Sequence, residues 1–324
     1  MMKILLTGGS GMCGCNILEH HTANDFDILS PSSSELNLLD KDKIREYLQK
    51  INPDLIVHTA GLVAGIQFNI KHPVSALVDN AYIGLNLISI AKELGVPKFL
   101  NLASSCMYPR FGENPLRETE ILKGELEPTN EGYALAKILS TRLCEYISKE
   151  VSELEYKTLI PCNLFGRHDT FSLEFSHMIP AAIQKLHDAK LRKDENVEIW
   201  GDGHTRREFM SASDLADLVF YCVENFETMP QNLNAGLGHD YSINEYYKIA
   251  AEVVGFQGTF THDLSKPAGM KQKLVDVSLL RKFGWEHNLS LERGLVEAYH
   301  FYKHDLDRYG SKVKVKDAFL ASGE

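Results

Sequence analysis

A short apolar run at the start of the chain leads directly into a glycine-rich turn, and this junction constrains the fold more than any other feature. Lys3–Thr7 has the composition of a buried strand, and a helical pattern over residues 11–22 follows the turn. Glycines between a strand and a helix permit a tight turn and let the helix N-terminus approach a pyrophosphate. The junction therefore predicts a dinucleotide-binding unit. Its predicted cofactor contacts are Gly8, Ser10, Gly11, Met12 and Gly14.

Strand-like and helical segments continue to alternate through the first half of the chain. The further predicted strands are Asp25–Ser30, Asp54–Thr59, Lys98–Ala103 and Tyr156–Ile160, and the further predicted helices begin near Asp40 and span residues 73–95 and 131–151. Such alternation is typical of a parallel sheet covered by helices on both faces. We therefore predict an α/β fold with a Rossmann-type doubly wound parallel sheet.

After Pro161 the pattern becomes less regular, which indicates a smaller, irregular α/β C-terminal lobe that binds substrate. We expect helices over residues 173–190, from Ser213 to Phe226, after a capping box at Ser242 and after Ser290, and a strand at Val197–Gly201. The expected domains are residues 1–165 for the cofactor, with a return at about 205–235, residues 166–204 and 236–305 for a sugar nucleotide, and a tail over 306–324.

Composition excludes some partners and favours one compartment. A formal net charge of −10 over 324 residues argues against binding to nucleic acid or to an anionic membrane. We find no signal peptide and no stretch that approaches the ~18 apolar residues of a membrane span, so we expect no membrane partner. The six cysteines lack CxxC spacing. This favours free thiols in the cytoplasm and no metal site.

The segment after the second predicted strand indicates which dinucleotide binds. An acidic residue at this strand end would hold the ribose hydroxyls of NAD, but the chain has hydroxyl residues at Ser30 and Ser32–Ser34, with Glu35 close by. Small hydroxyl groups can accommodate a 2′-phosphate, so we predict NADP(H). The further predicted cofactor contacts are Ser32, Ser33, Asn37, Leu38, Ala60 and Gly61.

Three residues in the first half could reduce a ketone. Tyr133 and Lys137 are four apart and share one face of a helix, and Ser104 follows the fourth predicted strand. A neighbouring lysine is expected to lower the phenol pKa, so that the tyrosine exchanges a proton near neutral pH. With the glycine turn, this pattern resembles the extended short-chain dehydrogenase/reductase superfamily over nearly the whole chain.

A more specific resemblance rests on sequence patterns spread over both halves. These lie at residues 104–109, 126–137, 161–169, 176–180, 200–203, 207–209 and 265–269. Together they closely resemble the GDP-L-fucose synthase family, whose members are NADPH-dependent GDP-4-keto-6-deoxy-D-mannose 3,5-epimerase/4-reductases. The resemblance implies reduction of a C4 ketone coupled to epimerisation at C3 and C5, in a homodimer formed through the helices at 73–95 and 131–151.

The resemblance also implies roles for single residues. Cys106 would be the base and His177 the acid of epimerisation, with a cationic His177 lowering the thiol pKa. Ser104 and Tyr133 would stabilise the enolate, and Tyr133 would then protonate the reduced oxygen. Taken without the family pattern, Cys106 is typical of a core residue and His177 of a packing residue. The implied substrate contacts are Asn163, His177, Trp200, Arg207 and Lys273.

Departures from the family pattern leave the sugar open. Cys162 replaces the usual threonine, Arg167 a proline and Ala268 an aspartate, and most such changes fall near the sugar pocket. The alternative is a dedicated 4-reductase of a related sugar such as a GDP-4-keto-6-deoxy-heptose. A third possibility, from another class, is an NADP-sensing regulator without enzyme activity. The intact Tyr133 and Lys137 argue against that regulator.

Overall fold

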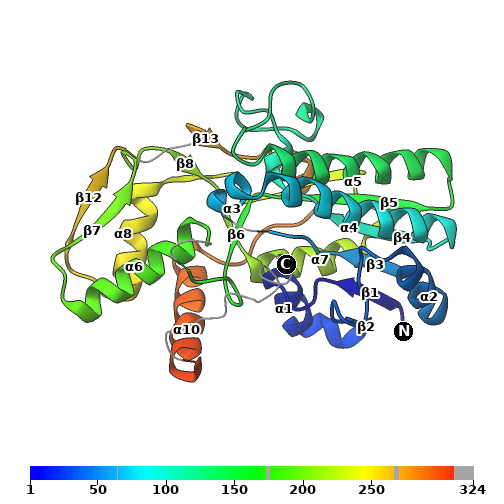
Figure 1. Cartoon of the computed structure of the whole chain (residues 1–324), viewed down its shortest axis with the longest axis horizontal. Coiled ribbons are helices and arrows are strands. Elements are labelled where there is room, and N and C mark those ends of the chain that lie inside the picture. The colour runs from blue at the N-terminus through cyan, green and yellow to red at the C-terminus, as the bar shows by residue number, and fades with distance from the viewer. Residues whose placement is uncertain (64, 173–175, 266–269, 310–324) are drawn as a thin grey trace.

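The computed structural model describes residues 1–63, 65–172, 176–265 and 270–309. Its centre is a six-stranded sheet in which every neighbouring pair of strands is parallel (Figure 1). The strand order is β10 (Asn232–Ala235), β5 (Glu155–Pro161), β4 (Lys98–Leu102), β3 (Leu55–His58), β1 (Lys3–Thr7) and β2 (Asp27–Leu29). Buried aliphatic residues fill these strands because helices cover both faces.

Helices lie on both sides of this sheet, which confirms the predicted doubly wound α/β fold (Figure 1). One side carries α2 (Lys41–Ile51), α4 (Pro73–Glu93) and α5 (Glu131–Glu150), and the other α1 (Met12–Glu19) and α7 (Ala212–Glu224). Two separate apolar clusters fill the two interfaces. The helices α4 and α5 pack closely, since a Cβ on Gly84 would lie 2.1 Å from the Ser140 hydroxyl oxygen.

The position of β1 creates the crevice in which a ligand can bind. From β1 the chain passes to β2 on one side and then to β3 on the other, so the strand order reverses there. In open α/β sheets, ligands bind at the carboxyl ends of the strands at such a point. The ends of β1 and β3 approach closely, because a Cβ on Gly8 would lie 2.6 Å from Thr59 Oγ1. Gly8 has φ 80°, which only glycine adopts readily.

The second lobe is built from short strands and helices around an aromatic-rich core. Its strand groups are β6 (Asn163–Phe165) with β9 (Phe209–Ser211), β7 (Asn196–Trp200) with β12 (Thr259–Asp263), and β11 (Tyr241–Ser242) with β8 (Arg206–Arg207) and β13 (Gln272–Lys273). The helices α6 (Met178–Arg192), α8 (Ile243–Val254) and α10 (Leu291–Tyr309) contribute to this core, whereas α9 (Ser278–Phe283) packs against β10 of the large sheet. The chain returns to the large sheet through α7 and β10 (Figure 1).

Several predicted boundaries shift in the structure for local reasons. The cap of α7 is Ser211, not Ser213, because the Ser211 hydroxyl accepts the N–H groups of Ser213 and Asp214. The helix predicted from residue 173 begins at Met178, and residues 173–175 lie outside the described part. The capping box at Ser242 is confirmed. The Ser290 hydroxyl accepts the Arg293 N–H at the start of the last helix, as predicted.

Short elements were missed where the sequence has little periodicity. These are α3 (Ile66–Lys71), α9, the strands β6 and β8 to β13, and the 3-10 helices η1 (His21–Asp25), η2 (Ser105–Met107), η3 (Glu118–Glu120) and η4 (Phe226–Thr228). The predicted tail begins too early, since α10 extends to Tyr309. The rest of that tail, residues 310–324, lies outside the described residues.

The helix α4 corrects one compositional expectation. Within the described chain it is the one helix long and apolar enough to cross a membrane, whereas the sequence analysis found no such stretch. Burial inside the protein explains its composition, because it packs between α2 and α5 and buries Asn80, Gly84 and Asn86 with its aliphatic residues. Length and composition alone do not distinguish such a core helix from a membrane span.

Candidate active site

The first turns of α5 carry the predicted reduction residues to the end of β4. Lys137 is buried, and its Nζ donates a hydrogen bond of 2.9 Å to the Leu102 carbonyl oxygen. The same Nζ lies 5.8 Å from the centroid of the Tyr133 ring. This contact places the tyrosine beside the residues that follow β4, because Leu102 is the last residue of that strand.

Two of those residues are Ser104 and Cys106. The Ser104 hydroxyl caps the 3-10 helix η2 by accepting the Cys106 N–H at 3.3 Å. Cys106 is buried, and its thiol interacts electrostatically with Tyr133. Ser104, Cys106, Tyr133 and Lys137 therefore lie together at one end of the sheet, as the sequence predicts.

The protonation of this group differs from the expectation. The pKa of Tyr133 lies well above its usual value, first because the phenol is buried and then because of the nearby Cys106 and Cys13 thiols. Burial also lowers the pKa of Lys137, to about 8. The expected lowering of the phenol pKa by the lysine is wrong for this state, since burial outweighs it. A neutral phenol is suited to donate a proton to an oxygen that gains negative charge.

The positive charge that acts on the predicted acid and base of epimerisation is that of Lys273. Burial raises the pKa of the Cys106 thiol, and the ammonium of Lys273 is the largest influence that opposes it. His177 is the N-cap residue of α6 and is exposed at the protein surface. Desolvation by the neighbouring protein atoms and, second, the charge of Lys273 lower its pKa. The expectation of a cationic His177 beside a thiolate is therefore wrong, and Lys273 supplies the positive charge.

Lys273 and Arg207 form a pair of neighbouring cations. They are partners in the parallel pairing of β13 with β8, so their side chains leave the sheet on the same side. Both are half-buried; desolvation and, to a smaller extent, the charge of Arg207 lower the pKa of Lys273. The Glu127 carboxylate acts on both in the opposite direction. Two adjacent, half-buried cations attract a polyanion such as a diphosphate.

Trp200 lies farther along the same lobe. Its ring is 45% exposed, and Lys185 Nζ lies 5.1 Å from the ring centroid. Lys185 is eight residues after His177 on α6, which corresponds to about 12 Å along the helix. Trp200 therefore lies beside a residue about two helical turns along α6 from His177.

The glycine turn fits the pyrophosphate of a dinucleotide. Among the described residues no side chain caps the N-terminus of α1, whose N-cap is Gly11. A Cβ on Gly14 would lie 2.3 Å from the Gly8 carbonyl oxygen, so the helix can approach β1 only with glycine at this position. A Cβ on Gly61 would lie 3.6 Å from Lys137 Nζ, so the loop after β3 passes close to Lys137. These residues would hold the cofactor across the crevice between β1 and β3.

The loop after β2 holds a carboxylate where the sequence analysis emphasised hydroxyl groups. Glu35 Oε2 accepts hydrogen bonds of 2.7 Å from both the N–H and the hydroxyl of Ser32. These bonds lower the pKa of Glu35, so it is ionised at neutral pH. Asn37 is exposed, and its side chain accepts the Leu39 N–H. Leu38 is buried in the core.

Several charged groups at the site were not singled out from the sequence. Lys185 stacks on Trp200, and Asp169 approaches Cys13 closely enough to raise that thiol's pKa. Burial raises the pKa of Asp169 to about 7, and its Oδ2 has no hydrogen-bond partner in the described structure. Glu208 is completely buried. Asp169 and Glu208 lie within the sequence patterns at residues 161–169 and 207–209, and these patterns were the available signal.

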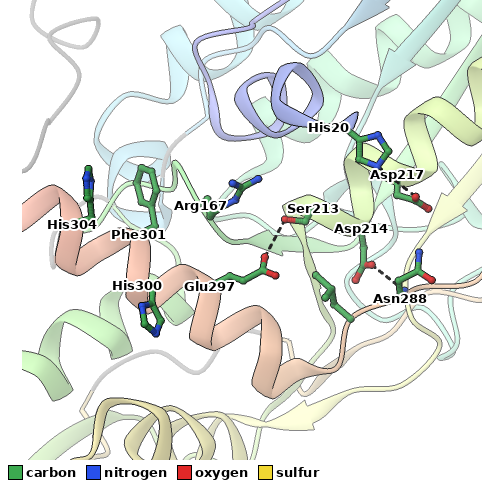
Figure 2. Close-up of a pocket in the computed structure, with 11 residues that line it drawn as sticks. His20, Arg167, Ser213, Asp214, Asp217, Asn288, Glu297, His300, Phe301 and His304 are labelled. Atoms are coloured by element: carbon green, nitrogen blue, oxygen red, sulfur yellow. Dashed lines mark hydrogen bonds and ion pairs between the residues drawn. The ribbon is translucent and has the colours of Figure 1, made fainter. Parts of the chain in front are cut away.

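A separate cavity lies away from these predicted site residues. Its volume is about 680 Å³, and it lies between α1, α7 and α10, with His20, Ser213 and Glu297 in its wall (Figure 2). None of the predicted site residues lines it. Its carboxylates have partners in the protein, such as Asn288 N–H for Asp214. In the part of the chain that the structure describes, no cluster of three His, Cys, Asp or Glu side chains could hold a metal ion.

Comparison with known proteins gives a consistent picture. Residues 4–238 match the model of the NAD dependent epimerase/dehydratase family. The chain is 54% identical over 301 residues to GDP-L-colitose synthase of Yersinia pseudotuberculosis, covering 93% of this chain and 98% of the relative. It is 44% identical over 300 residues to GDP-L-fucose synthase of Azorhizobium caulinodans, covering 93% and 96%. The structure of MlghC, a GDP-mannoheptose C4 reductase from Campylobacter jejuni with NADP bound, superimposes with a TM-score of 0.84 at 28% identity, covering 93% of this chain and 98% of that one.

The Glu35 carboxylate generates a prediction about cofactor preference. We expect wild-type protein to prefer NADPH, and we expect Glu35→Gln to raise kcat/KM with NADPH several-fold, because it removes a negative charge that faces the 2′-phosphate. With NADH the change should be small. Steady-state kinetics with both cofactors at low and high salt measures this, since salt should weaken the effect. Equal changes for both cofactors would contradict a role at the 2′-phosphate.

Proposed function

Because the chain belongs to the NAD dependent epimerase/dehydratase family and, within it, to the GDP-L-fucose synthase family, we propose that it reduces the C4 ketone of a GDP-linked 4-keto-6-deoxy sugar and epimerises carbon next to that ketone. NADP(H) is the cofactor. The grouping of Tyr133, Lys137, Ser104 and Cys106 at the end of β4 carries the proposal, since it joins a proton donor for the ketone oxygen to a base for carbon.

For the reduction, the neutral Tyr133 donates its phenolic proton to the C4 oxygen, and Ser104 hydrogen-bonds to the same oxygen. Bound NADPH supplies the hydride. Lys137 holds its place through the Leu102 carbonyl, and its positive charge stabilises the phenolate that remains after the proton has left. The phenolate then recovers a proton from water.

For the epimerisation, Cys106 removes a proton from a carbon beside the ketone, and His177 delivers a proton to the opposite face. The C4 oxygen carries the negative charge of the enolate, and Tyr133 and Ser104 stabilise it by hydrogen bonds. Lys273 favours the thiolate of Cys106, because it is the strongest positive charge acting on the buried thiol. His177 takes the proton that it delivers from water, and after the inversion the Cys106 thiol releases the abstracted proton to water, so that both groups regain their starting protonation.

The relative at 54% identity directs us to one sugar within this class. It is named for colitose, which differs from fucose by the absence of the oxygen at C3. A 3-deoxy sugar needs inversion at C5 alone, so we propose a GDP-4-keto-3,6-dideoxy-hexose as the preferred substrate. The replacement of the family's threonine by Cys162 beside Asn163 supports a pocket with altered polarity near the sugar.

A second candidate is a dedicated C4 reductase. It is favoured by the similarity to MlghC, whose name assigns a heptose and a reduction at C4. In that case Cys106 and His177 would position the sugar and would not exchange protons with carbon. Incubation of the protein in D₂O with each GDP-keto-sugar, followed by NMR of the products, distinguishes the two candidates. The alternative of a regulator without enzyme activity is not retained, because the chain belongs to an enzyme family.

We further propose that the protein is a cytoplasmic homodimer. Val74, Val78 and Tyr82 form an exposed apolar stripe at every fourth residue of α4, and Leu139 and Tyr146 continue it on α5. An apolar surface shared by two adjacent helices suits an isologous contact with a second copy. The six cysteines are all free, which supports a reducing compartment.

The first test of the mechanism concerns Tyr133. Tyr133→Phe should reduce the rate of ketone reduction by ~10²–10⁴, the usual contribution of a positioned proton donor, and should leave NADPH binding nearly unchanged. Absorbance at the NADPH band follows the rate, and cofactor fluorescence follows binding. Tyr247→Phe, which removes a hydroxyl on α8 in the apolar core of the second lobe, is the matched control. Near wild-type turnover by the Tyr133 variant would remove this residue from the mechanism.

The second test separates the two reactions. Cys106→Ser should abolish the incorporation of solvent deuterium beside the ketone in the absence of NADPH, because a hydroxyl is a far weaker base than a thiolate. The same variant should still reduce the ketone and give an unepimerised sugar. Cys144→Ser changes another buried thiol, about three turns along α5 from Tyr133, and should keep the exchange. Absence of exchange in wild-type protein with every substrate, together with active reduction, would establish the dedicated reductase.

The third test concerns the dimer. Replacing Tyr82 and Tyr146 with glutamate should shift the mass measured by light scattering from two chains to one, because the charges would be buried against their symmetry-related copies. Leu191→Glu, at a residue that is 69% exposed on α6, should leave the mass unchanged. A wild-type protein that is monomeric at all concentrations, or a double variant that remains dimeric, would show that the stripe is not the interface.

A further inference from the structure

Glu208 is a carboxylate with no solvent exposure, located between β8 and β9. Its Oε1 accepts hydrogen bonds from the N–H groups of Leu237 and Gly238, at 2.6 and 2.8 Å, and its Oε2 accepts the Val275 N–H at 3.0 Å. Burial raises its pKa to about 7 in spite of these three bonds. A buried carboxylate that uses both oxygens on separate backbone segments holds those segments at a fixed spacing.

These segments belong to different parts of the fold. Leu237 and Gly238 follow β10 of the large sheet, and Val275 lies two residues after Lys273 on β13. The loop after β10 reaches the carboxylate only because residue 236 is glycine, since a Cβ there would lie 2.6 Å from Glu208 Oε1. Glu208 thus connects the cofactor-binding sheet to the strand that carries Lys273.

The main chain of Glu208 extends this connection. Its N–H donates to the Lys273 carbonyl oxygen at 3.3 Å, and its own carbonyl oxygen accepts the Asn163 side-chain amide at 2.9 Å. Arg207 is the preceding residue and pairs in register with Lys273. Lys273 and Asn163 are therefore hydrogen-bonded to Glu208, and Arg207 is adjacent to it in the chain. All three are predicted substrate contacts.

The strand β13 has only two residues, so few backbone bonds fix the position of Lys273. Arg207 and Lys273 also repel each other, because two like charges are paired in register on adjacent strands. The bond from Val275 N–H to Glu208 continues the attachment of this strand beyond its last paired residue. Without that bond, repulsion would favour separation of the two cations.

We propose that Glu208 is a positioning residue that holds Arg207 and Lys273 at the spacing needed to bind the diphosphate of the sugar nucleotide. This inference rests on the proposed function, because it takes a GDP-linked sugar as the substrate. Glu208 acts through the two cations and does not contact the reacting carbon atoms. Its loss should therefore weaken binding of the nucleotide and leave the chemical step nearly unaltered.

Glu208→Gln is the direct test, because an amide oxygen can accept on one side only and the amide N–H₂ would face a donor on the other. GDP binding is measured by calorimetry, and KM and kcat with the GDP-keto-sugar by NADPH absorbance. We expect the GDP dissociation constant and KM to rise about tenfold, as for loss of a charge-assisted hydrogen bond, with kcat and NADPH binding within about twofold of wild type. Glu208→Asp, which keeps the charge on a shorter side chain, should be intermediate.

Asp214→Asn is the matched control. Asp214 is also a buried carboxylate that accepts a backbone N–H, from Asn288 at 3.0 Å, but it lies on α7 away from the cation pair. This variant should lower the melting temperature and leave GDP binding unchanged. Equal GDP affinity of wild type and Glu208→Gln, whatever their melting temperatures, would overturn the positioning role.

Two further measurements distinguish a failure of the positioning role from a failure of the proposed function. In a Lys273→Met background, Glu208→Gln should have a smaller effect on GDP affinity than in wild type, because one of the two cations that it spaces is gone, and full additivity would overturn the inference. If Glu208→Gln does not fold, Glu208→Asp carries the same comparison. Failure of wild-type protein to bind GDP would overturn the proposed function itself, a result independent of any variant.

Discussion

The hydrogen bond from Lys137 Nζ to the Leu102 carbonyl joins the first turns of α5 to the end of β4, and the active site is organised around it. A lysine ammonium is expensive to bury, so it remains in the interior only where an acceptor is fixed by the sheet. The strand supplies that acceptor as its last residue. The same bond sets how far Tyr133 lies from Ser104, because the tyrosine is one helical turn from the lysine.

Burial has a larger influence on this site than any single pair of charges. It keeps Tyr133 and Cys106 protonated and makes Lys137 a weaker base than usual. A largely neutral resting site suits a reaction in which charge appears on the substrate oxygen and is stabilised by groups that are already in place. The cation that acts on the thiol comes from the second lobe, on the two-residue strand β13. The proton chemistry near β4 therefore depends on how firmly the second lobe is attached to the sheet.

The predictable part of the site consists of residues near one another in sequence or in a repeated local pattern. The strand and glycine turn predict the crevice at β1, and the spacing of Tyr133 and Lys137 predicts one helix face. The grouping of these residues with Ser104 follows from parallel strands that end at one edge of the sheet. Short elements such as β10 could not be predicted, because the four residues of this strand include two asparagines and form no apolar run.

The sequence by itself determined the family, the doubly wound sheet and the identity of the reactive side chains, because these depend on periodicity and on local motifs. Only the tertiary structure decided the charges of those side chains and their partners. The position of Lys273 near Cys106 and of Glu208 between separate backbone segments results from the packing of distant strands and loops. A pKa depends on all the atoms that surround a group, and most of these come from residues far away in the chain.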